Sequence, residues 1–421
     1  MVSTPHEVAP APDTSQIIDS CDVACCIVGS GPAGAMLSLL LARRGLKVVL
    51  LEMHKDFDRE FRGDTVHPST LEILDQLGLA ERALSLGHGK VVSPFFQAAN
   101  GPFAPVDLRR LKTKFPFILM VPQTKLLDLL TQEAMKYPNF RLVMGANATE
   151  LITENGATRG VRYQSDDGQH EVRALLTVGA DGRFSRIRNL AGIVPTKSAP
   201  PMDVLWFKLP HLPSDPNAPG GAFGAIGMGH MVIGLERGDY WQCGYVILKG
   251  SYQEVRAEGI DGLRRHIVEI LPALAEHVES LTDWHQVALL SVESSLCPLW
   301  CKPGLLLIGD AAHVMSPVGG VGINYAIQDA VVAANILTKP LLSGQVTLED
   351  LRKVQRKREW PTRVIQSFQS RAQQSIIATA LQSTQMISIP WYVRAFFRAP
   401  VIRDLPARLI AFGPVRVRVE N

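Results

Sequence analysis

The hydrophobic and polar positions near the start of the chain follow the pattern of a strand, a tight turn, a helix and a second strand. Residues 23–28 form a short continuous apolar run, which is typical of a parallel strand buried on both faces. A glycine-rich segment at 29–34 follows. Residues 35–44 then have helical composition and end at Gly45, and residues 47–51 return to an apolar strand. A βαβ unit of this kind predicts an α/β fold with a doubly wound sheet.

Later segments predict a second sheet and a helical tail. Strand-like segments between residues 203 and 250 are separated by turns rich in Gly and Pro, which indicates an antiparallel sheet inserted into the first domain. Residues 305–308 form another buried parallel strand, and residues 322–337 form a helix. The predicted units are a disordered N-terminal tail (1–20), a Rossmann-like nucleotide-binding domain (21–90, 117–195 and 296–345), an inserted antiparallel substrate domain (91–116 and 196–295) and a mostly helical C-terminal region (346–421).

Composition and charge narrow the class of protein. The 421 residues are 46% hydrophobic and 20% charged, and the formal net charge is +3, so nothing favours a nucleic-acid partner. Residues 352–421 carry 13 Lys and Arg against 3 Asp and Glu. Such a basic tail indicates either a surface that faces phosphates or a membrane, or a solvated helical appendage.

The same composition sets expectations about location and metals. The chain lacks the run of about 18 apolar residues that spans a membrane, and residues 1–20 lack the basic start and apolar centre of a signal peptide. Six cysteines do not make a disulfide framework in a chain of this length, and Cys297 and Cys301 have no second Cys or His cluster to complete a metal site. We expect a cytoplasmic protein, soluble or peripheral to a membrane, without a bound metal.

The glycine-rich turn has the spacing of a dinucleotide-binding fingerprint. Gly29 permits the tight turn, Gly31 lets the backbone reach a pyrophosphate, and Gly34 lets the helix pack closely on the strand. The start of the helix, which includes Ala33, faces the phosphates with its unpaired N–H groups. Glu52 ends the second strand, where a carboxylate accepts hydrogen bonds from ribose hydroxyls. The alternative is a purely structural glycine turn with an acid at that place by chance.

A second glycine-rich site lies far downstream. Gly309 and Asp310 directly follow a buried strand, which places the Asp310 carboxylate to accept a hydrogen bond from a cofactor hydroxyl. The loop that opens the next helix adds three candidate positions: Gly320, Gly322 and Ile323. N–H groups at a helix start suit the electron-rich pyrimidine edge of a flavin. A second site distant from the first therefore favours FAD over NAD as the bound cofactor.

These features make the chain resemble the flavoprotein monooxygenases of the p-hydroxybenzoate hydroxylase type, which are single-component FAD-dependent aromatic hydroxylases, over nearly its whole length. Three motifs match in order: the glycine fingerprint, the segment 180–188 with Asp181, which is similar to the family's Asp-Gly motif, and the Gly-Asp motif at 309–322. Two single positions also match. Arg62 falls where the family keeps an arginine near the flavin diphosphate, and Gln123 falls where a Gln or Arg meets the ribityl chain.

The resemblance implies a reaction as well as a cofactor. NADH or NADPH reduces the FAD, O2 adds at the flavin C4a to give a hydroperoxide, and one oxygen atom passes to an aromatic or polycyclic small molecule. The segment 317–322 borders the isoalloxazine ring in this family, which makes Pro317 a candidate for the catalytic site. A proline before a helix is also a common structural breaker.

His67 is the candidate acid or base. It lies in the loop at 62–68, which passes near the flavin ring in the family. An imidazole with an ordinary pKa of about 6.5 is suited to take a proton from a phenol or to relay one. The structural alternative is that His67 only begins the next helix.

The substrate does not follow from the resemblance. The well-studied hydroxybenzoate enzymes bind a substrate carboxylate with arginine and hydroxyl groups on the inserted sheet, whereas here the corresponding strands offer Trp206, Lys208, Trp241 and Gln242. By strand alternation Trp241 and Tyr245 share one face, and the sequence leaves open which face lines the pocket. Two other functions stay open: a related flavin oxidoreductase acting on an isoprenoid or quinone at a membrane surface, and a flavin-binding accessory protein without turnover.

Overall fold

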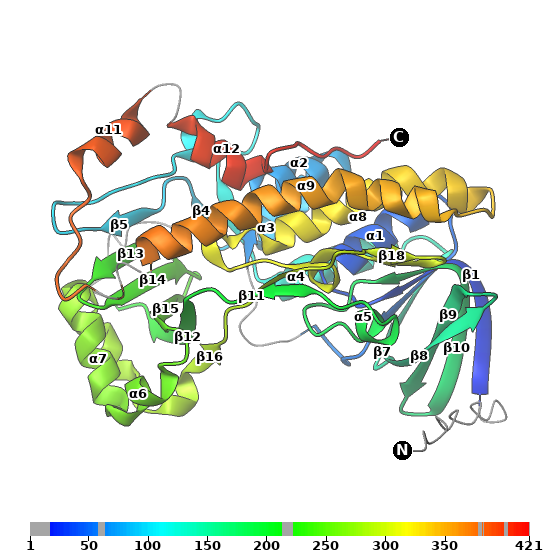
Figure 1. The fold of residues 1–421 in the computed structure, drawn as a ribbon, viewed down its shortest axis with the longest axis horizontal. Helices are drawn as coiled ribbons and strands as arrows, with labels where there is room; N and C mark the ends of the chain where they lie inside the picture. The colour runs from blue at the N-terminus through cyan, green and yellow to red at the C-terminus, as the bar shows by residue number, and fades with distance from the viewer. Residues whose placement is uncertain are drawn as a thin grey trace, which may run out of the picture.

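The structure is a computed structural model that describes residues 17–57, 64–212, 222–377, 381, 383–399 and 403–420. Two bodies of sheet and helix lie beside each other, and the long helices α8 (Gly322–Leu342) and α9 (Leu348–Ala372) run across the view below α11 and α12 (Figure 1). An eight-stranded sheet belongs to one body and a six-stranded sheet to the other.

The eight-stranded sheet is the centre of the first body. Its strands are β1 (Ile17–Val28), β2 (Val48–Glu52), β7 (Phe140–Met144), β8 (Asn147–Glu154), β9 (Ala157–Ser165), β10 (Gly168–Gly179), β18 (Cys301–Lys302) and β19 (Leu305–Leu307). The central order β19–β10–β1–β2–β7 is parallel throughout, while β18, β8 and β9 pair antiparallel at its sides. The predicted doubly wound sheet is confirmed.

The first strand begins earlier than its apolar run predicts. Ile17 already pairs with Gln169 of β10, so residues 17–20 belong to the sheet and not to the predicted N-terminal tail. The polar residues Asp19 and Ser20 interrupt the hydrophobic pattern, so the pattern does not predict a strand here. The strand forms because β10, far along the chain, pairs with it in parallel. The preceding residues of the predicted tail lie outside the described part of the chain.

The six-stranded sheet forms the second body, with the order β16–β12–β15–β14–β13–β5. Its strands are β5 (Phe95–Gln97), β12 (Met202–Pro210), β13 (Ala222–Gly227), β14 (His230–Glu236), β15 (Tyr240–Leu248) and β16 (Ala288–Leu290). Neighbours pair antiparallel except β5 and β13, which are parallel. Helix α7 (Gly259–Ile270), next to α6 (Tyr252–Ala257), covers one face (Figure 1).

Short elements connect the two bodies. One three-stranded sheet joins β3 (Thr65–Val66), β6 (Ile118–Met120) and β4 (Gly89–Val91), and another joins β11 (Thr196–Ser198), β17 (Ser294–Leu296) and β20 (His313–Val314). The described α-helices before α6 are α1 (Pro32–Arg43), α2 (Pro68–Gln76), α3 (Ala80–Leu86), α4 (Gln123–Ala134) and α5 (Arg186–Leu190).

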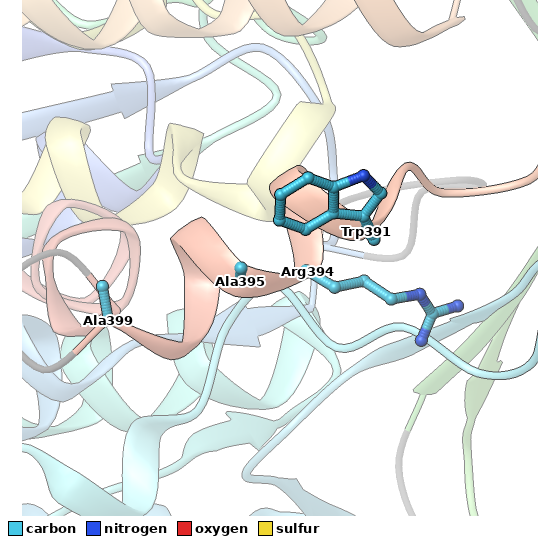
Figure 2. Close-up of a pocket in the computed structure, with 4 residues that line it drawn as sticks. All are labelled: Trp391, Arg394, Ala395 and Ala399. Atoms are coloured by element: carbon cyan, nitrogen blue, oxygen red, sulfur yellow. The ribbon is translucent and has the colours of Figure 1, made fainter.

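The C-terminal region is helical, as predicted, and folds back over both bodies. Beyond α9 the chain passes the inserted sheet, where the Met228 N–H donates to the Gln385 carbonyl at 3.0 Å. Helix α11 (Trp391–Arg398) follows, with Trp391 and Arg394 leaving it in different directions (Figure 2). Helix α12 (Asp404–Phe412) then packs near α2. This region is therefore not a solvated appendage.

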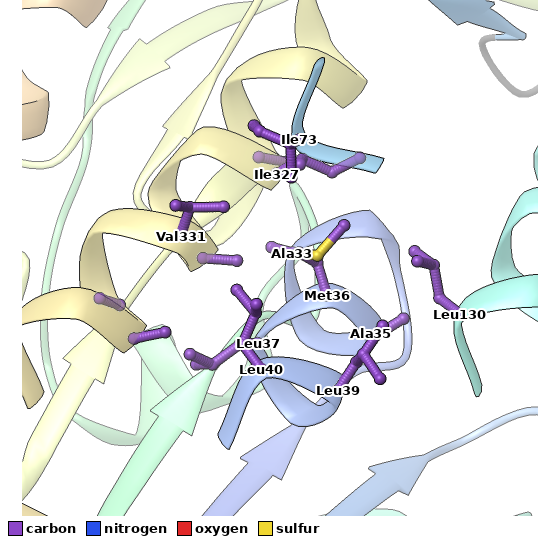
Figure 3. Packing of buried hydrophobic residues seen from close by; sticks show 14 of the residues in the cluster. Ala33, Ala35, Met36, Leu37, Leu39, Leu40, Ile73, Leu130, Ile327 and Val331 are labelled. Atoms are coloured by element: carbon purple, nitrogen blue, oxygen red, sulfur yellow. The ribbon is translucent and has the colours of Figure 1, made fainter. Parts of the chain in front are cut away.

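The largest apolar core lies between the helices and the eight-stranded sheet. Met36 and Leu37 of α1 lie close to Ile327 and Val331 of α8, and Leu130 of α4 approaches α1 from another side (Figure 3). Burial on several sides explains why α1 is apolar along its whole length. This packing fixes the starts of α1 and α8, which carry the two predicted glycine sites. No helix in the described part of the chain is both long and apolar enough to cross a bilayer.

Candidate active site

The predicted fingerprint forms the turn between β1 and α1. Gly29 has a φ of +100°, and a Cβ atom on Gly34 would lie 1.9 Å from the Gly29 carbonyl oxygen. The turn itself therefore requires these two glycines. Gly31 differs, because its φ of −72° suits any residue and the nearest protein atom to a Cβ there would be the Ala180 carbonyl oxygen at 3.9 Å.

The open space beside Gly31 lies at the N-terminal end of α1. Gly31 caps this helix without a side-chain hydrogen bond, and Pro32 and Ala33 form its first turn. A helix start presents unpaired N–H groups and a partial positive charge, which suit a diphosphate. The cradle that a side chain at Gly31 would fill therefore fits the diphosphate of FAD.

Glu52 is buried beside the same turn, with 2% of its surface exposed. Its two carboxylate oxygens accept hydrogen bonds from the backbone N–H groups of Ser30 at 2.9 Å and His54 at 3.0 Å. Glu52 therefore orders the turn, and a carboxylate at this place is an acceptor of the kind that suits a ribose hydroxyl. The buried Ser30 hydroxyl has no hydrogen-bond partner among the described residues, which also fits a polar ligand at this place.

Asp181 follows the carboxyl end of β10 and closes its own turn. Its carboxylate accepts hydrogen bonds from the Ser185 hydroxyl at 2.5 Å and the Ile187 N–H at 2.9 Å, which orders the start of α5. Burial raises the pKa of Asp181 above its ordinary value. The preceding Ala180 lies against Gly29, so this motif adjoins the fingerprint. A contact between Asp181 and the cofactor stays a prediction.

The Gly-Asp motif meets the fingerprint across the ends of the parallel strands. Gly309 has a φ of +59°, and a Cβ there would lie 3.1 Å from the Cβ of Ala33 in α1. Asp310 is partly exposed in the same turn. Arg188 of the Asp-Gly motif is buried and donates to the Ala311 carbonyl at 3.1 Å. The structure thus brings all three predicted motifs together at one edge of the sheet.

A buried charged cluster, which the sequence analysis missed, supports the Gly-Asp motif from behind. The fully buried Asp329 accepts hydrogen bonds from the Gly309 N–H at 2.9 Å, His313 Nε2 at 2.6 Å and Arg358 Nε at 2.6 Å. Burial alone would raise the pKa of Asp329, but its interactions with His313 and Arg358 hold that pKa below its ordinary value. The available signal was the single acid in α8, a helix whose sequence is mostly apolar.

The second glycine loop lies between β20 and α8. Pro317 precedes a tight turn in which Gly320 has a φ of +62° and accepts a hydrogen bond from the Thr65 hydroxyl at 2.7 Å. Gly322 and Ile323 form the first turn of α8, and a Cβ on Gly322 meets no atom within 4 Å. The start of α8 therefore offers a second open cradle beside unpaired N–H groups.

Two residues outside the three motifs, Gln123 and Arg62, complete the set of predicted cofactor-binding residues. Gln123 is the first residue of α4, and its N–H donates to the Asp64 carboxylate at 3.3 Å. Asp64 also forms a buried ion pair with Arg237, which ties the inserted sheet to this loop. Arg62 lies outside the described residues, and its role stays a prediction.

His67 precedes the first turn of α2 and is fully buried. Its Nδ1 lies 2.8 Å from the Ile410 carbonyl oxygen of α12, and its backbone N–H donates to Asn324 Oδ1 at 2.8 Å. Burial lowers the pKa of His67 to about 4, against the opposing effect of the Ile410 and Gly320 carbonyls. The ring is therefore neutral at neutral pH and lies next to the second glycine loop.

Replacing His67 with glutamine should reduce the loss of stability in acid. The unfolded histidine titrates near pH 6.5 and the folded one near 4, so protonation favours the unfolded chain as the pH falls between these values. In the wild type this single group should cost on the order of 3 kcal/mol by the end of that window. Urea unfolding at several pH values between 7 and 4 measures the difference, and identical pH profiles for the two proteins would contradict it.

The inserted sheet presents its two faces to different neighbours. Trp241 and Tyr245 face α7 and belong to the core of the second body. Trp206 and Val246 lie on the opposite face, in an apolar cluster that includes Val318 of the second glycine loop. The face with Trp206 is therefore the one turned toward the candidate flavin site.

Comparison with known proteins decides the family. A family model described as FAD binding domain matches residues 21–365. The 6-methylpretetramide 4-monooxygenase of Streptomyces rimosus is 32% identical over 398 residues, which cover 94% of each chain. This chain belongs to the FAD-dependent aromatic hydroxylases. As a member of this family it is an enzyme, an FAD-dependent monooxygenase, so the predicted family, enzyme class and cofactor are confirmed.

Further matches agree with this family. The 12-dehydrotetracycline 5-monooxygenase/anhydrotetracycline 6-monooxygenase of Streptomyces rimosus subsp. rimosus is 30% identical over 72% of this chain and 60% of its own. The structure of OxyS anhydrotetracycline hydroxylase from Streptomyces rimosus gives a TM-score of 0.73 at 23% identity and covers 95% of this chain and 77% of that chain. PqsL from Pseudomonas aeruginosa gives 0.72 at 21% identity, over 85% and 97% of the two chains. At these sequence identities, the two solved structures show only that the fold is similar.

Proposed function

We propose that this hydroxylase uses NADH or NADPH and O2 to insert one oxygen atom into a polycyclic aromatic small molecule. The observation that carries the proposal is the arrangement of two open cradles, beside Gly31 and Gly322, with the apolar sheet face that carries Trp206 next to the second glycine loop. The relative that matches along 94% of the chain is named for a polycyclic substrate, 6-methylpretetramide, which supports the same substrate class.

The residues present fit FAD. The start of α1 at Gly31 would hold the diphosphate, Glu52 and Asp310 would accept hydrogen bonds from cofactor hydroxyls, and the N–H groups of the first turn of α8 would meet the pyrimidine edge. Bound FAD supplies electron transfer from the nicotinamide and activation of O2. The chain's own contribution is to bind and orient the reactants and to exclude water.

The substrate side favours a ring system over a small acid. Trp206, Ile233 and Val246 make the face toward the second glycine loop largely apolar. Lys208 is exposed, and the Gln242 side chain donates to the Phe207 carbonyl at 2.9 Å. Neither residue reproduces the arginine and hydroxyl groups that bind a carboxylate in the hydroxybenzoate enzymes. Apolar pockets with few polar groups suit polycyclic ligands.

The test measures cofactor content and substrate-stimulated turnover. The purified protein should be yellow and should release FAD on denaturation. NADPH and NADH oxidation is then followed with tetracyclic aromatic polyketides and, as the control, with p-hydroxybenzoate. We expect a tetracyclic compound to accelerate oxidation and to gain the mass of one oxygen. FAD-loaded protein that no compound stimulates would support an accessory protein instead, and stimulation by p-hydroxybenzoate alone would contradict the polycyclic class.

A direct catalytic role for His67 is part of this proposal. Its ring lies beside the second glycine loop and is neutral, and its pKa of about 4 makes it a weak base that suits passing a proton on better than holding one. If it accepts the substrate proton, His67→Gln should keep FAD and still consume NAD(P)H but release hydrogen peroxide in place of product. The ratio of product formed to NAD(P)H consumed measures this coupling. If the ratio is unchanged in His67→Gln, His67 has only a structural role at the start of α2.

A related flavin oxidoreductase that acts on an isoprenoid or quinone at a membrane surface is the second candidate. Helix α11 favours it, because Trp391, which lines a hollow of about 520 Å³, is 79% exposed and the next residue, Tyr392, is 60% exposed. Arg394 points away from Trp391 and donates to the Pro102 carbonyl at 3.0 Å, so it is not directed at a lipid headgroup (Figure 2). Sedimentation with anionic vesicles distinguishes the candidates: loss of binding in Trp391→Ser would support this one, and no binding by the wild type would exclude it.

A further inference from the structure

Three glutamines, two near the end of α9 and one directly after it, donate hydrogen bonds to residues in and beside the second glycine loop. Gln366 donates to the carbonyls of Ser295 at 2.9 Å and Val314 at 3.0 Å. One turn later, Gln369 donates to the carbonyls of Ser316 at 2.9 Å and Val318 at 2.7 Å. A third residue, Gln373, donates to the Ser316 hydroxyl. These contacts join a helix of the C-terminal region to a loop more than 50 residues earlier in the chain.

The two bonds of Gln369 enclose Pro317. The amide group of Gln369 donates to the carbonyls of the residues immediately before and after this proline. Within the loop, the Val318 N–H also donates to the Ser316 hydroxyl at 3.2 Å. Gln369 is only 2% exposed, so water does not readily replace these bonds. The loop carbonyls are thereby turned toward α9, and the chain leaves this clamp directly into the turn at Gly320 and the start of α8.

Hydrogen bonds fix the part of this loop around Ser316 and Pro317, between residues that are held by apolar packing. Met315 and Val321 lie in an apolar cluster with Ile365 of α9, and Val318 lies in the apolar cluster with Trp206. Behind Ser316, by contrast, there is a polar cleft of about 630 Å³ that Gln369 also lines. Loss of the Gln369 donor should therefore shift the middle of the loop while its packed ends preserve the fold.

We propose that Gln369 is a positioning residue for the flavin, which sets the place of Pro317 and of the N–H groups at the start of α8 without touching the cofactor. Those N–H groups favour negative charge on a bound flavin ring, so their position affects both FAD affinity and the reduction potential of the ring. The inference rests on the proposed orientation of FAD at the second glycine loop. It does not depend on which substrate is oxidised.

The test compares Gln369→Met with Gln366→Met as a matched control. Methionine keeps the unbranched shape but cannot donate, and each variant loses two bonds to backbone carbonyls. We expect both apoproteins to unfold at similar temperatures. Only Gln369→Met should bind FAD more weakly, by about tenfold, roughly the contribution of one hydrogen bond. It should also shift the visible spectrum and the midpoint potential of the bound FAD.

Two results would overturn the inference. In the first, Gln369→Met and Gln366→Met have the same FAD affinity, spectrum and potential. In the second, Gln369→Met lowers the unfolding temperature of the apoprotein much more than the control does, so that the FAD effect follows from lost stability. These readouts require bound FAD but no substrate. A failure of the proposed hydroxylation, scored by product formation, is therefore a separate result.

Discussion

Replacing Gly31 with valine should abolish FAD binding and leave the apoprotein folded, whereas the same replacement at Gly34 should prevent stable folding. A Cβ at Gly34 overlaps the Gly29 carbonyl oxygen at 1.9 Å, so the turn between β1 and α1 cannot close. We expect that variant to lose more than about 4 kcal/mol, which is exceptional for a point substitution. At Gly31 the protein itself leaves room, and we expect the apoprotein to stay within about 1 kcal/mol of the wild type.

The contrast between the two glycines separates a structural requirement from a ligand requirement. Gly31 has an ordinary φ of −72°, and a Cβ there would lie 3.9 Å from its nearest neighbour, the Ala180 carbonyl oxygen, so the described residues do not explain why a glycine stands there. A diphosphate at the start of α1 does explain it. Circular dichroism and thermal unfolding report on the fold, and flavin absorbance after reconstitution reports on binding. Full FAD content in Gly31→Val would place the diphosphate elsewhere.

The parts of the site that the sequence predicted are those set by local geometry. The turn at Gly29 and Gly34 admits only glycine at fixed spacing, and Glu52 ends the next strand, so one short segment carries the whole pattern. The position of Gly309 after a buried strand is similarly local. In a parallel sheet the carboxyl ends of neighbouring strands lie at one edge, which is why motifs far apart in sequence meet there.

The parts that the sequence analysis missed depend on partners from distant segments. Residues 17–20 are too polar to look like a strand until β10 is placed beside them. Gln369 and Asp329 look like ordinary helical residues, because their partners are backbone groups and an arginine that no spacing rule connects to them. The basic charge of the tail suggested a solvated appendage, whereas the Ile410 carbonyl of α12 contacts His67.

Replacing Asp329 with asparagine should destabilise the protein by about 3–5 kcal/mol, because the change leaves a buried guanidinium without its counter-charge. Arg358 is 1% exposed, and its two Nη atoms have no hydrogen-bond partner among the described residues. Apart from the ring of Tyr325 at 5.2 Å, its charge is balanced by Asp329. The double variant Asp329→Asn, Arg358→Met removes the charge as well as its partner, so it should recover a large part of the loss.

The cluster around Asp329 should also change how the stability of the protein depends on pH in acid. The folded pKa of Asp329 lies below its ordinary value, so the cluster stabilises the protein above the unfolded pKa of about 3.9 and loses that contribution as the pH falls through the lower folded pKa. Asp329→Asn should lack this part of the acid transition. Its FAD content should also fall, because the Gly309 N–H loses its carboxylate partner in the Gly-Asp motif. Urea unfolding of Asp329→Asn, of Arg358→Met and of the double variant gives the coupling energy between the two residues directly. Additive effects, with no recovery in the double variant, would show that Asp329 and Arg358 act separately and that the motif is held by packing instead.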